Sequence, residues 1–173
     1  MVRSARNLLF PAVAAALVLL AGLQLLWRGV NAEPELRWIS PGDTLPALTG
    51  NLAGLPVTLE LEEGLACSYV VFMNPDCPTC IELGPRWALE FGSGAPVPAL
   101  MIAFSPEDAA MAFMSRFGID APLLALHNPR DVAVNVGVLA VPTILAVRGG
   151  VVREVMHGTR YDLDDPSRDR DCG

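Results

Sequence analysis

The chain joins an apolar run to two closely spaced cysteines in Ser68-Tyr69-Val70-Val71-Phe72-Met73-Asn74-Pro75-Asp76-Cys77-Pro78-Thr79-Cys80. Residues 68–73 are β-branched, aromatic or otherwise apolar, which predicts a buried strand. Residues 74–76 have the composition of a turn, and residues 81–91 after the second cysteine are typical of a helix. The cysteine pair is therefore expected where a buried strand passes into a helix.

That position predicts the chemistry of the pair. At a helix N-terminus, unpaired backbone N–H groups and the helix dipole stabilise a Cys77 thiolate, and Pro78 suits the first helical position. Asp76 opposes this stabilisation electrostatically. Cys80 follows one helical turn later, and we expect it to be more buried than Cys77 and to have a higher pKa. It would be the thiol that resolves a mixed disulfide. The pair is typical of dithiol–disulfide exchange, and an inert disulfide or half of a metal site are the alternatives.

Composition limits the classes of function. The chain has 173 residues and a net charge of −7, and all twelve of its basic residues are arginine. The acidic balance and the absence of a basic cluster argue against binding to nucleic acid. The four cysteines are too few and too dispersed for a small domain held together by disulfides. About 140 residues after the N-terminal segment are enough for one domain with its own core.

The N-terminus has the pattern of an export segment. Residues 8–27 form an apolar run long enough to span a bilayer, and the arginines within residues 1–7 favour a cytoplasmic N-terminus. We expect a single transmembrane anchor that places the domain in the periplasm or outside the cell. The alternative is a signal peptide cleaved near Ala32, which would leave a soluble periplasmic protein. Residues 28–41 are expected to be a linker.

The rest of the chain alternates strand and helix patterns and ends in a hairpin. This order predicts an α/β three-layer sandwich with a mixed central sheet in one domain, residues 42–160, and a charged, disordered tail over residues 161–173. The expected strands are 47–49, 57–59, 97–104, 121–126, 141–147 and 151–156, with turns at Gly50 to Gly54 and at Gly149-Gly150. The expected helices are 105–117, capped by Ser105, and one from Asn128 to about Val134.

The cysteine pair, combined with the distant Val141-Pro142-Thr143, resembles the thioredoxin fold. Pro85, five residues after Cys80, matches the proline that kinks the active-site helix of that family. Gly150 and Gly158 follow Pro142 at intervals of eight residues, as the family's hairpin glycine and the glycine beside its substrate groove do. The resemblance covers roughly residues 42–158.

Two further stretches narrow the resemblance. The opening Gly42-Asp43-Thr44-Leu45-Pro46 is similar to that of membrane-anchored, TlpA-like thiol–disulfide oxidoreductases. Residues 72–80 and Ser105-Pro106-Glu107 are similar to the methylamine-utilisation accessory (MauD-like) branch. The resemblance implies a client protein with disulfides or thiols, in methylamine dehydrogenase maturation or cytochrome c biogenesis, and an inner-membrane electron donor. It implies no cofactor beyond the Cys77–Cys80 disulfide and no bound metal.

The resemblance also implies roles for residues around the pair. Pro142 should follow a cis peptide bond and lie against the cysteines, with the Val141 backbone free to pair with an extended client. Thr79 would support the active site, and a groove for the client would be formed by Thr143, His157 and Gly158. The family's buried acidic residue has no counterpart, because Val71 and Leu83 occupy its two usual positions.

The remaining cysteines, histidines and tryptophans receive other interpretations. Cys67 lies at the far end of the strand from Cys77, too distant to pair with it, and is expected to be a buried, inert thiol. Cys172 in the tail could reach Cys77.

Two alternative functions remain open. One is a copper-delivery module that uses the cysteine pair with a histidine, either His127 or His157. The other is a non-catalytic docking module. Trp38 and Trp87 are expected to be packing residues.

Overall fold

The computed structural model describes residues 17–24, 27, 37–61, 67–92, 94–95 and 97–159. The chain divides into two compact units, Met1–Glu35 and Leu36–Gly173. In the first unit residues 17–24 are helical, and no described helix is long and apolar enough to cross a bilayer. The expected cytoplasmic end, much of the expected anchor 8–27, any cleavage site near Ala32 and the expected tail 161–173 lie outside the described residues.

The second unit is built on one seven-stranded sheet with the order β2-β1-β5-β4-β3-β6-β7. Strand β3 pairs in parallel with β4, and β4 in parallel with β5, while the other neighbours are antiparallel. The sheet is therefore mixed, as the sequence predicts. The elements are β1 (Leu48–Leu52), β2 (Leu55–Leu59), β3 (Ser68–Met73), α2 (Pro78–Glu90), β4 (Ala99–Ala103), α3 (Glu107–Phe117), β5 (Leu123–Leu126), α4 (Pro129–Val136), β6 (Thr143–Arg148) and β7 (Val151–His157).

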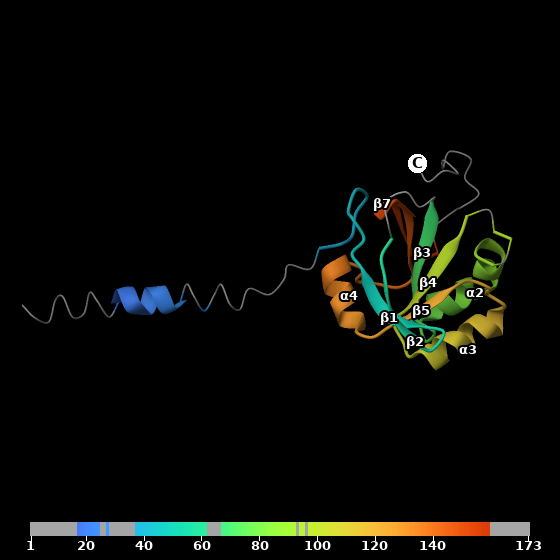
Figure 1. Cartoon of the computed structure of the whole chain (residues 1–173), viewed down its shortest axis with the longest axis horizontal. Coiled ribbons are helices and arrows are strands. Elements are labelled where there is room, and N and C mark those ends of the chain that lie inside the picture. The colour runs from blue at the N-terminus through green and yellow to red at the C-terminus, as the bar shows by residue number, and fades with distance from the viewer. Residues whose placement is uncertain are drawn as a thin grey trace, which may run out of the picture. The chain divides into compact units, whose positions relative to one another are not determined.

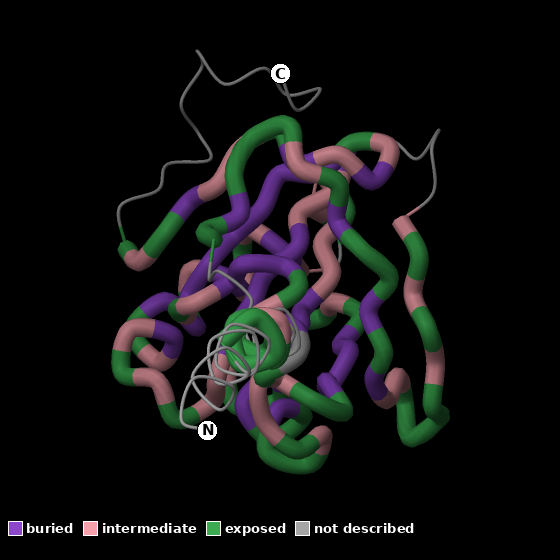
Figure 2. The backbone as a smooth tube through the Cα atoms, turned by 90° about the vertical axis from the view of Figure 1, so that its left-hand side faces the viewer, coloured by how far each residue is buried: buried purple, intermediate pink, exposed green. Residues whose placement is uncertain are grey.

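Helices cover both faces of the sheet, with α2 and α3 on one side and α4 on the other (Figure 1). Strand β3 has a side chain on each face in turn: Val71 and Met73 join the core beneath α2 and α3, whereas Val70 and Phe72 join the core on the α4 side. All four are fully buried, and Figure 2 shows the buried backbone running through the middle of the fold. A strand buried on both faces explains its uninterrupted apolar sequence.

Two hairpins close with two-residue turns in which both φ angles are positive. The turn between β6 and β7 is Gly149-Gly150, as expected, with φ of 59° and 74°. The turn between β1 and β2 is Ala53-Gly54, with φ of 52° and 78°. These values suit the twist of hairpin strands. Gly50, expected in the turn, instead lies within β1, where a Cβ would come 2.4 Å from the backbone oxygen of Ala125.

Helix α3 begins one residue later than the sequence predicts. Its N-cap is Pro106 and not Ser105, whose hydroxyl does not cap the helix and instead donates to the Pro106 carbonyl. The carboxylate of Glu107 accepts a hydrogen bond of 2.7 Å from the backbone N–H of Gly54. The first turn of α3 therefore anchors the β1–β2 hairpin. Helix α4 is capped by the Asn128 side chain, as predicted.

The segment 37–41, predicted to be part of a linker, packs on the domain. Ile39 is 5% exposed and belongs to the core on the α4 side. Its backbone N–H donates to the carbonyl of Gly137, at the C-terminus of α4, at 3.0 Å. Arg37 pairs with Asp43, whose side chain also accepts from the Ser40 backbone N–H. A stretch as short as 37–41, with only Trp38 and Ile39 as large apolar side chains, is a weak local signal, which is why the sequence pattern missed this contact.

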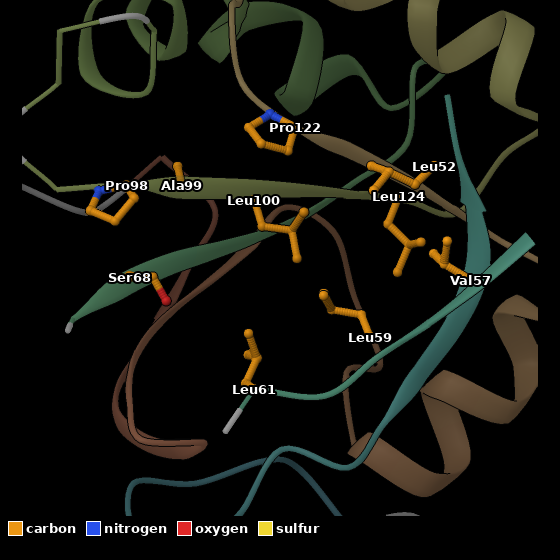
Figure 3. A pocket seen from close by; sticks show the side chains of 10 residues that line it. All are labelled: Leu52, Val57, Leu59, Leu61, Ser68, Pro98, Ala99, Leu100, Pro122 and Leu124. Atoms are coloured by element: carbon orange, nitrogen blue, oxygen red, sulfur yellow. The ribbon is translucent and has the colours of Figure 1, made fainter. Parts of the chain in front are cut away.

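A cavity of about 360 Å³ lies on the α4 side of the sheet, at the amino ends of the parallel strands. Figure 3 shows leucines from β1, β2 and β4 around it, with Ser68 at the start of β3. Its described lining contains no charged side chain and no thiol. The cysteine pair follows the opposite, carboxyl end of β3, so this cavity lies away from the free thiols.

Candidate active site

The turn after β3 is held by one side chain, that of Asn74. Its carboxamide oxygen accepts from the backbone N–H of Asp76 at 2.9 Å, and its amide donates to the Phe104 carbonyl after β4 at 3.3 Å. The Asn74 carbonyl accepts from the backbone N–H of Cys77 at 3.0 Å. These bonds fix the direction in which the chain enters the helix. The sequence pattern identified a turn here but not the role of Asn74.

Cys77 is the N-cap of α2, with φ −77° and ψ 120°. Its carbonyl accepts the first helical hydrogen bond, from Ile81 N–H at 3.0 Å, and Pro78 occupies the first helical position without losing a hydrogen bond. No side chain caps this end of the helix. Cys77 therefore stands at the N-terminus of α2, the end at which the first-turn N–H groups have no partner within the helix, as the sequence predicts.

The two thiols are free, and their environments differ. Cys77 is partly exposed, whereas Cys80 is fully buried in the core beneath α2. The pKa of Cys80 is raised to about 12, chiefly because burial disfavours the charged form. A hydrogen bond from the Asn74 backbone lowers this pKa, and the neighbouring Cys77 raises it. Cys77 is the accessible sulfur of the pair, and Cys80 stays protonated until its environment changes.

The side chains that surround Cys80 in the core are apolar, including Val71 and Leu83. Val71 is fully buried and Leu83 is 5% exposed, and both pack in the same core as Cys80. Across the part of the chain that the structure describes, Thr143 is the single polar residue in the buried class. The described core therefore offers Cys80 no carboxylate as a proton acceptor.

The loop before β6 lies against the cysteine pair. The Val141–Pro142 peptide bond is cis, as the resemblance implies. The Cys77 thiol donates to the Val141 carbonyl at 3.5 Å, and Val141 packs against the core that holds Cys80. The carbonyl of Pro142 accepts from Gly158 N–H at 3.1 Å, which joins this loop to the end of β7.

A groove of about 420 Å³ opens beside the pair. It is lined by Trp38, Thr79, Ala140, Val141, Pro142, His157 and Gly158. Five of these are residues that the sequence assigns to the site, namely Thr79, Val141, Pro142, His157 and Gly158. Thr143 differs from the expectation, because it is fully buried and lies beneath the groove, where its side chain cannot meet a client.

The Thr143 hydroxyl bonds to two partners beneath the groove. It donates to the Ala140 carbonyl at 2.8 Å and lies 3.0 Å from Nδ1 of His157. The His157 ring meets the Trp38 ring in an edge-to-face contact, with ring centroids 5.4 Å apart. Trp38 is 46% exposed, so it forms a wall of the groove. The sequence pattern missed this role, since only the packing of segment 37–39 on Gly137 places it there.

Other predicted residues lie at the edge of the site or away from it. Asp76 is exposed beside Cys77, and Pro85 lies inside α2, two turns after the N-terminus. His127 lies outside the groove, where its Nε2 is 2.7 Å from the side-chain oxygen of Asn51. Trp87 is fully buried against Phe113, which confirms its packing role. The described residues contain no group of three side chains suited to a metal ion.

Cys67 is not the inert thiol that the sequence analysis expected, because it is disulfide-bonded. Neither Cys77 nor Cys80 is its partner, since both are free. The prediction that Cys67 cannot pair with Cys77 is therefore confirmed. Cys172, the fourth cysteine of the sequence, lies outside the described residues. The chain thus carries one cysteine in a disulfide at the far end of β3 and a separate free pair at the groove.

Comparisons with known proteins agree with the fold. No protein-family model and no curated protein matches the sequence. Among solved structures, the thio-disulfide isomerase of Thermus thermophilus matches with a TM-score of 0.51 and 25% identity, covering 71% of this chain and 89% of that one. A secreted Mycobacterium tuberculosis disulfide oxidoreductase homologous to E. coli DsbE matches with a TM-score of 0.54 and 18% identity. The match covers 67% of this chain and 87% of that one.

A peroxiredoxin-like protein of Aquifex aeolicus matches too, with a TM-score of 0.57 and 14% identity over 70% of this chain and 78% of that one. These matches show the fold of the chain and do not by themselves assign its function. The present chain carries a free Cys77–Cys80 pair at the N-terminus of α2. The second unit of this chain has the thioredoxin-like α/β fold with a mixed seven-stranded sheet, its structural matches include thiol–disulfide oxidoreductases and isomerases, and it carries the cysteine pair at 77–80.

Proposed function

We propose that the protein is an extracytoplasmic thiol–disulfide oxidoreductase that acts on a client protein through Cys77 and Cys80. The observation that carries this proposal is the asymmetry of the pair. Cys77 is partly exposed at a helix N-terminus and touches the cis-proline loop, whereas Cys80 is fully buried and its pKa is raised to about 12. An accessible attacking sulfur beside a protected resolving sulfur is the arrangement that two-step exchange requires.

The exchange proceeds in two steps. The Cys77 thiolate attacks one sulfur of a client disulfide, forming a mixed disulfide and releasing the other client sulfur as a thiolate that takes up a proton. Cys80 then loses its proton and attacks the Cys77 sulfur, which breaks the mixed disulfide and releases the second client thiol. The client has gained two electrons, and Cys77 and Cys80 are left as a disulfide. A membrane-bound dithiol donor must return two electrons before the next cycle.

The Val141 backbone supports this sequence of events. Its carbonyl already accepts a weak hydrogen bond from the Cys77 thiol, and the same residue lines the groove. An extended client segment in the groove would place its disulfide beside Cys77. The proposal therefore assigns the groove residues, including Pro142 and Gly158, to client binding.

Location outside the cytoplasm is supported by two observations. The sequence contains the apolar run 8–27 behind two arginines, and Cys67 is disulfide-bonded. Structural disulfides persist in oxidising compartments such as the periplasm. We propose that the run either tethers the domain to the inner membrane or is removed near Ala32. Labelling of Cys77 in intact cells by a membrane-impermeant maleimide tests this location, since a cytoplasmic thiol would stay unlabelled.

For the client, we propose a disulfide-bearing partner undergoing maturation, either methylamine dehydrogenase or a c-type cytochrome. The resemblance of residues 72–80 and 105–107 to the MauD-like branch favours the first. Thr143 also favours the first, because many cytochrome c maturation reductases have a glutamate after the cis-proline. Co-purification of each client with a Cys80→Ala variant, which traps the mixed disulfide on Cys77, distinguishes the two.

The reduction potential of the full chain tests the activity itself. Equilibration with a glutathione or dithiothreitol couple should show a reversible two-electron transition that disappears in Cys77→Ser and in Cys80→Ser. A value near about −270 mV marks a reductase, and a value near about −120 mV marks a disulfide donor or isomerase. The proposal fails if wild-type protein shows no such transition.

A further inference from the structure

The Thr143 hydroxyl determines which nitrogen of His157 carries a proton. A threonine hydroxyl has one proton to donate. That proton goes to the Ala140 carbonyl at 2.8 Å, because a carbonyl oxygen can only accept. The remaining contact, 3.0 Å to Nδ1 of His157, must therefore run in the other direction, with Nδ1–H donating to the hydroxyl oxygen. Since Thr143 is fully buried, water does not compete for either bond.

This assignment leaves Nε2 of the neutral imidazole as an acceptor. Nε2 lies on the other side of the ring from Nδ1, and none of the described residues donates to it. His157 is exposed and lines the groove beside the cysteine pair. The groove therefore contains an oriented side-chain acceptor, held in place from beneath by Thr143 and along its ring by the edge-to-face contact with Trp38.

The rest of the groove is largely apolar. Trp38, Ala140, Val141 and Pro142 contribute its walls, and Thr79 adds a hydroxyl. Its described lining includes no carboxylate and no cationic side chain. Moving a charged group from water into such surroundings without a partner is costly. A side chain that fits here is uncharged, has an apolar body for the Trp38 wall, and offers a donor to Nε2.

We propose that His157 Nε2 selects client segments that place a tyrosine, or another uncharged aromatic side chain bearing a hydrogen-bond donor, next to the cysteine under attack. The inference rests on the proposed exchange function and adds a specificity determinant to it. Two residues connect this groove to the reacting sulfur. Val141 lines the groove and accepts from the Cys77 thiol, and Thr79 lies between the two cysteines in sequence.

The direct test compares peptide disulfides that differ only in the residue before the cysteine, which is tyrosine, phenylalanine or glutamate. Reduced full-length protein is mixed with each peptide near neutral pH, and the rate constant of peptide reduction is measured. We expect tyrosine to react about three- to tenfold faster than phenylalanine, the effect of one added hydrogen bond. Glutamate should be slowest, because its carboxylate meets an acceptor in an apolar groove.

Two variants test whether His157 causes the faster reduction of the tyrosine peptide. His157→Phe keeps an aromatic ring against Trp38 but has no acceptor, so the tyrosine-to-phenylalanine ratio should fall to about one. His127→Phe, at the other histidine of the chain, is the matched control and should keep the wild-type ratio. Equal rates for the two peptides with wild-type protein, or a ratio that survives in His157→Phe, would overturn the proposal.

The ring nitrogens provide a second measurement that needs no client. The ¹⁵N chemical shifts of wild-type His157 should show a protonated Nδ1 and an unprotonated Nε2. Thr143→Val removes the acceptor of Nδ1–H, so the Nε2–H tautomer should gain population and the tyrosine preference should weaken. A wild-type ring with its proton on Nε2 contradicts the inference, even if the variant fails to fold.

These outcomes also separate the two proposals. If wild-type protein reduces none of the peptides and shows no reversible two-electron couple, the exchange function itself is wrong. If it reduces all three at one rate, exchange stands and the role of His157 as a selector is wrong.

Discussion

The sulfur of Cys77 lies 3.5 Å from the carbonyl oxygen of Val141, although the two residues are 64 positions apart in the chain. The first caps helix α2 and the second precedes the cis-proline. Their contact brings the attacking sulfur to the edge of the groove in which Trp38 and His157 form walls. Under the proposed function, Val141 would couple attack to client binding, because it both contacts the Cys77 sulfur and lines the groove.

The difference in exposure between the two thiols predicts selective alkylation. In reduced protein near neutral pH, iodoacetamide should modify Cys77 and leave Cys80 unmodified, because Cys80 is fully buried and its pKa is raised to about 12. Peptide mass mapping after brief labelling measures this. Cys80→Ala should react as wild type does, and modification of both thiols at similar rates would contradict the assignment of roles.

The raised pKa of Cys80 also predicts how the stability of the reduced protein depends on pH. The folded state holds this proton more tightly than the unfolded chain, in which a thiol has a pKa of about 8.5. The contribution to the free energy of unfolding is thus fully present below that value and is lost as the pH rises toward about 12. Urea unfolding of reduced wild type and of Cys80→Ala measures it, and the wild type should lose more stability with rising pH. Parallel pH profiles would show that Cys80 contributes nothing.

A comparison of two helix-ending glycines tests how segment 37–39 is placed. Gly118 and Gly137 end α3 and α4 with φ of 71° and 78°. A Cβ on Gly118 meets nothing within 4 Å, whereas one on Gly137 would lie 2.2 Å from the Arg37 oxygen and 2.7 Å from the Ile39 nitrogen. Gly118→Ala should cost about 1–2 kcal/mol from the left-handed conformation alone.

Gly137→Ala should cost a further 1–3 kcal/mol or so from the overlap and displace Trp38 from His157. Urea unfolding measures the first effect, and changed ring signals of His157 in NMR spectra measure the second. Equal stability of the two variants, with His157 signals unaltered in both, would mean that Gly137 does not position the groove wall.

The disulfide at Cys67 predicts how this cysteine reacts with alkylating agents and how much its removal destabilises the fold. In denatured, unreduced protein Cys67 should resist alkylation, and it should react fully after reduction. Cys67→Ala should lower the free energy of unfolding by about 2–5 kcal/mol. Exchange activity of the folded variant should persist, since Cys67 precedes β3 and the free pair follows its other end. A Cys67 that reacts without reduction would contradict the structure.

Several features of the site follow from local sequence. The position of Cys77 at a helix N-terminus can be predicted because the apolar strand, the Asn-Pro-Asp turn and Pro78 are adjacent in the chain. The burial of Cys80 follows from its place one turn into an amphipathic helix. The Gly149-Gly150 hairpin follows from the need for two positive φ angles, which glycine adopts without strain.

Other features depend on contacts between distant residues. Trp38 forms a wall of the groove because its segment packs on Gly137. Cys67 forms a disulfide with a partner that no local pattern identifies. The sequence placed Thr143 in the groove because it follows Pro142, but the direction of its side chain is decided by the Ala140 carbonyl and the His157 ring. Such contacts join separate elements, so their geometry is absent from the spacing of residues along the chain.

By itself the amino-acid sequence determined the order of strands and helices, the chemistry of the cysteine pair and the apolar character of both faces of β3, because each depends on neighbours within a few residues. Only the tertiary structure decided which side chains form the groove and which nitrogen of His157 is available. Those properties depend on the ring contact between Trp38 and His157, more than a hundred positions apart in the chain, and on the hydrogen bond between Thr143 and His157 on neighbouring strands. Such contacts exist only once the sheet has assembled.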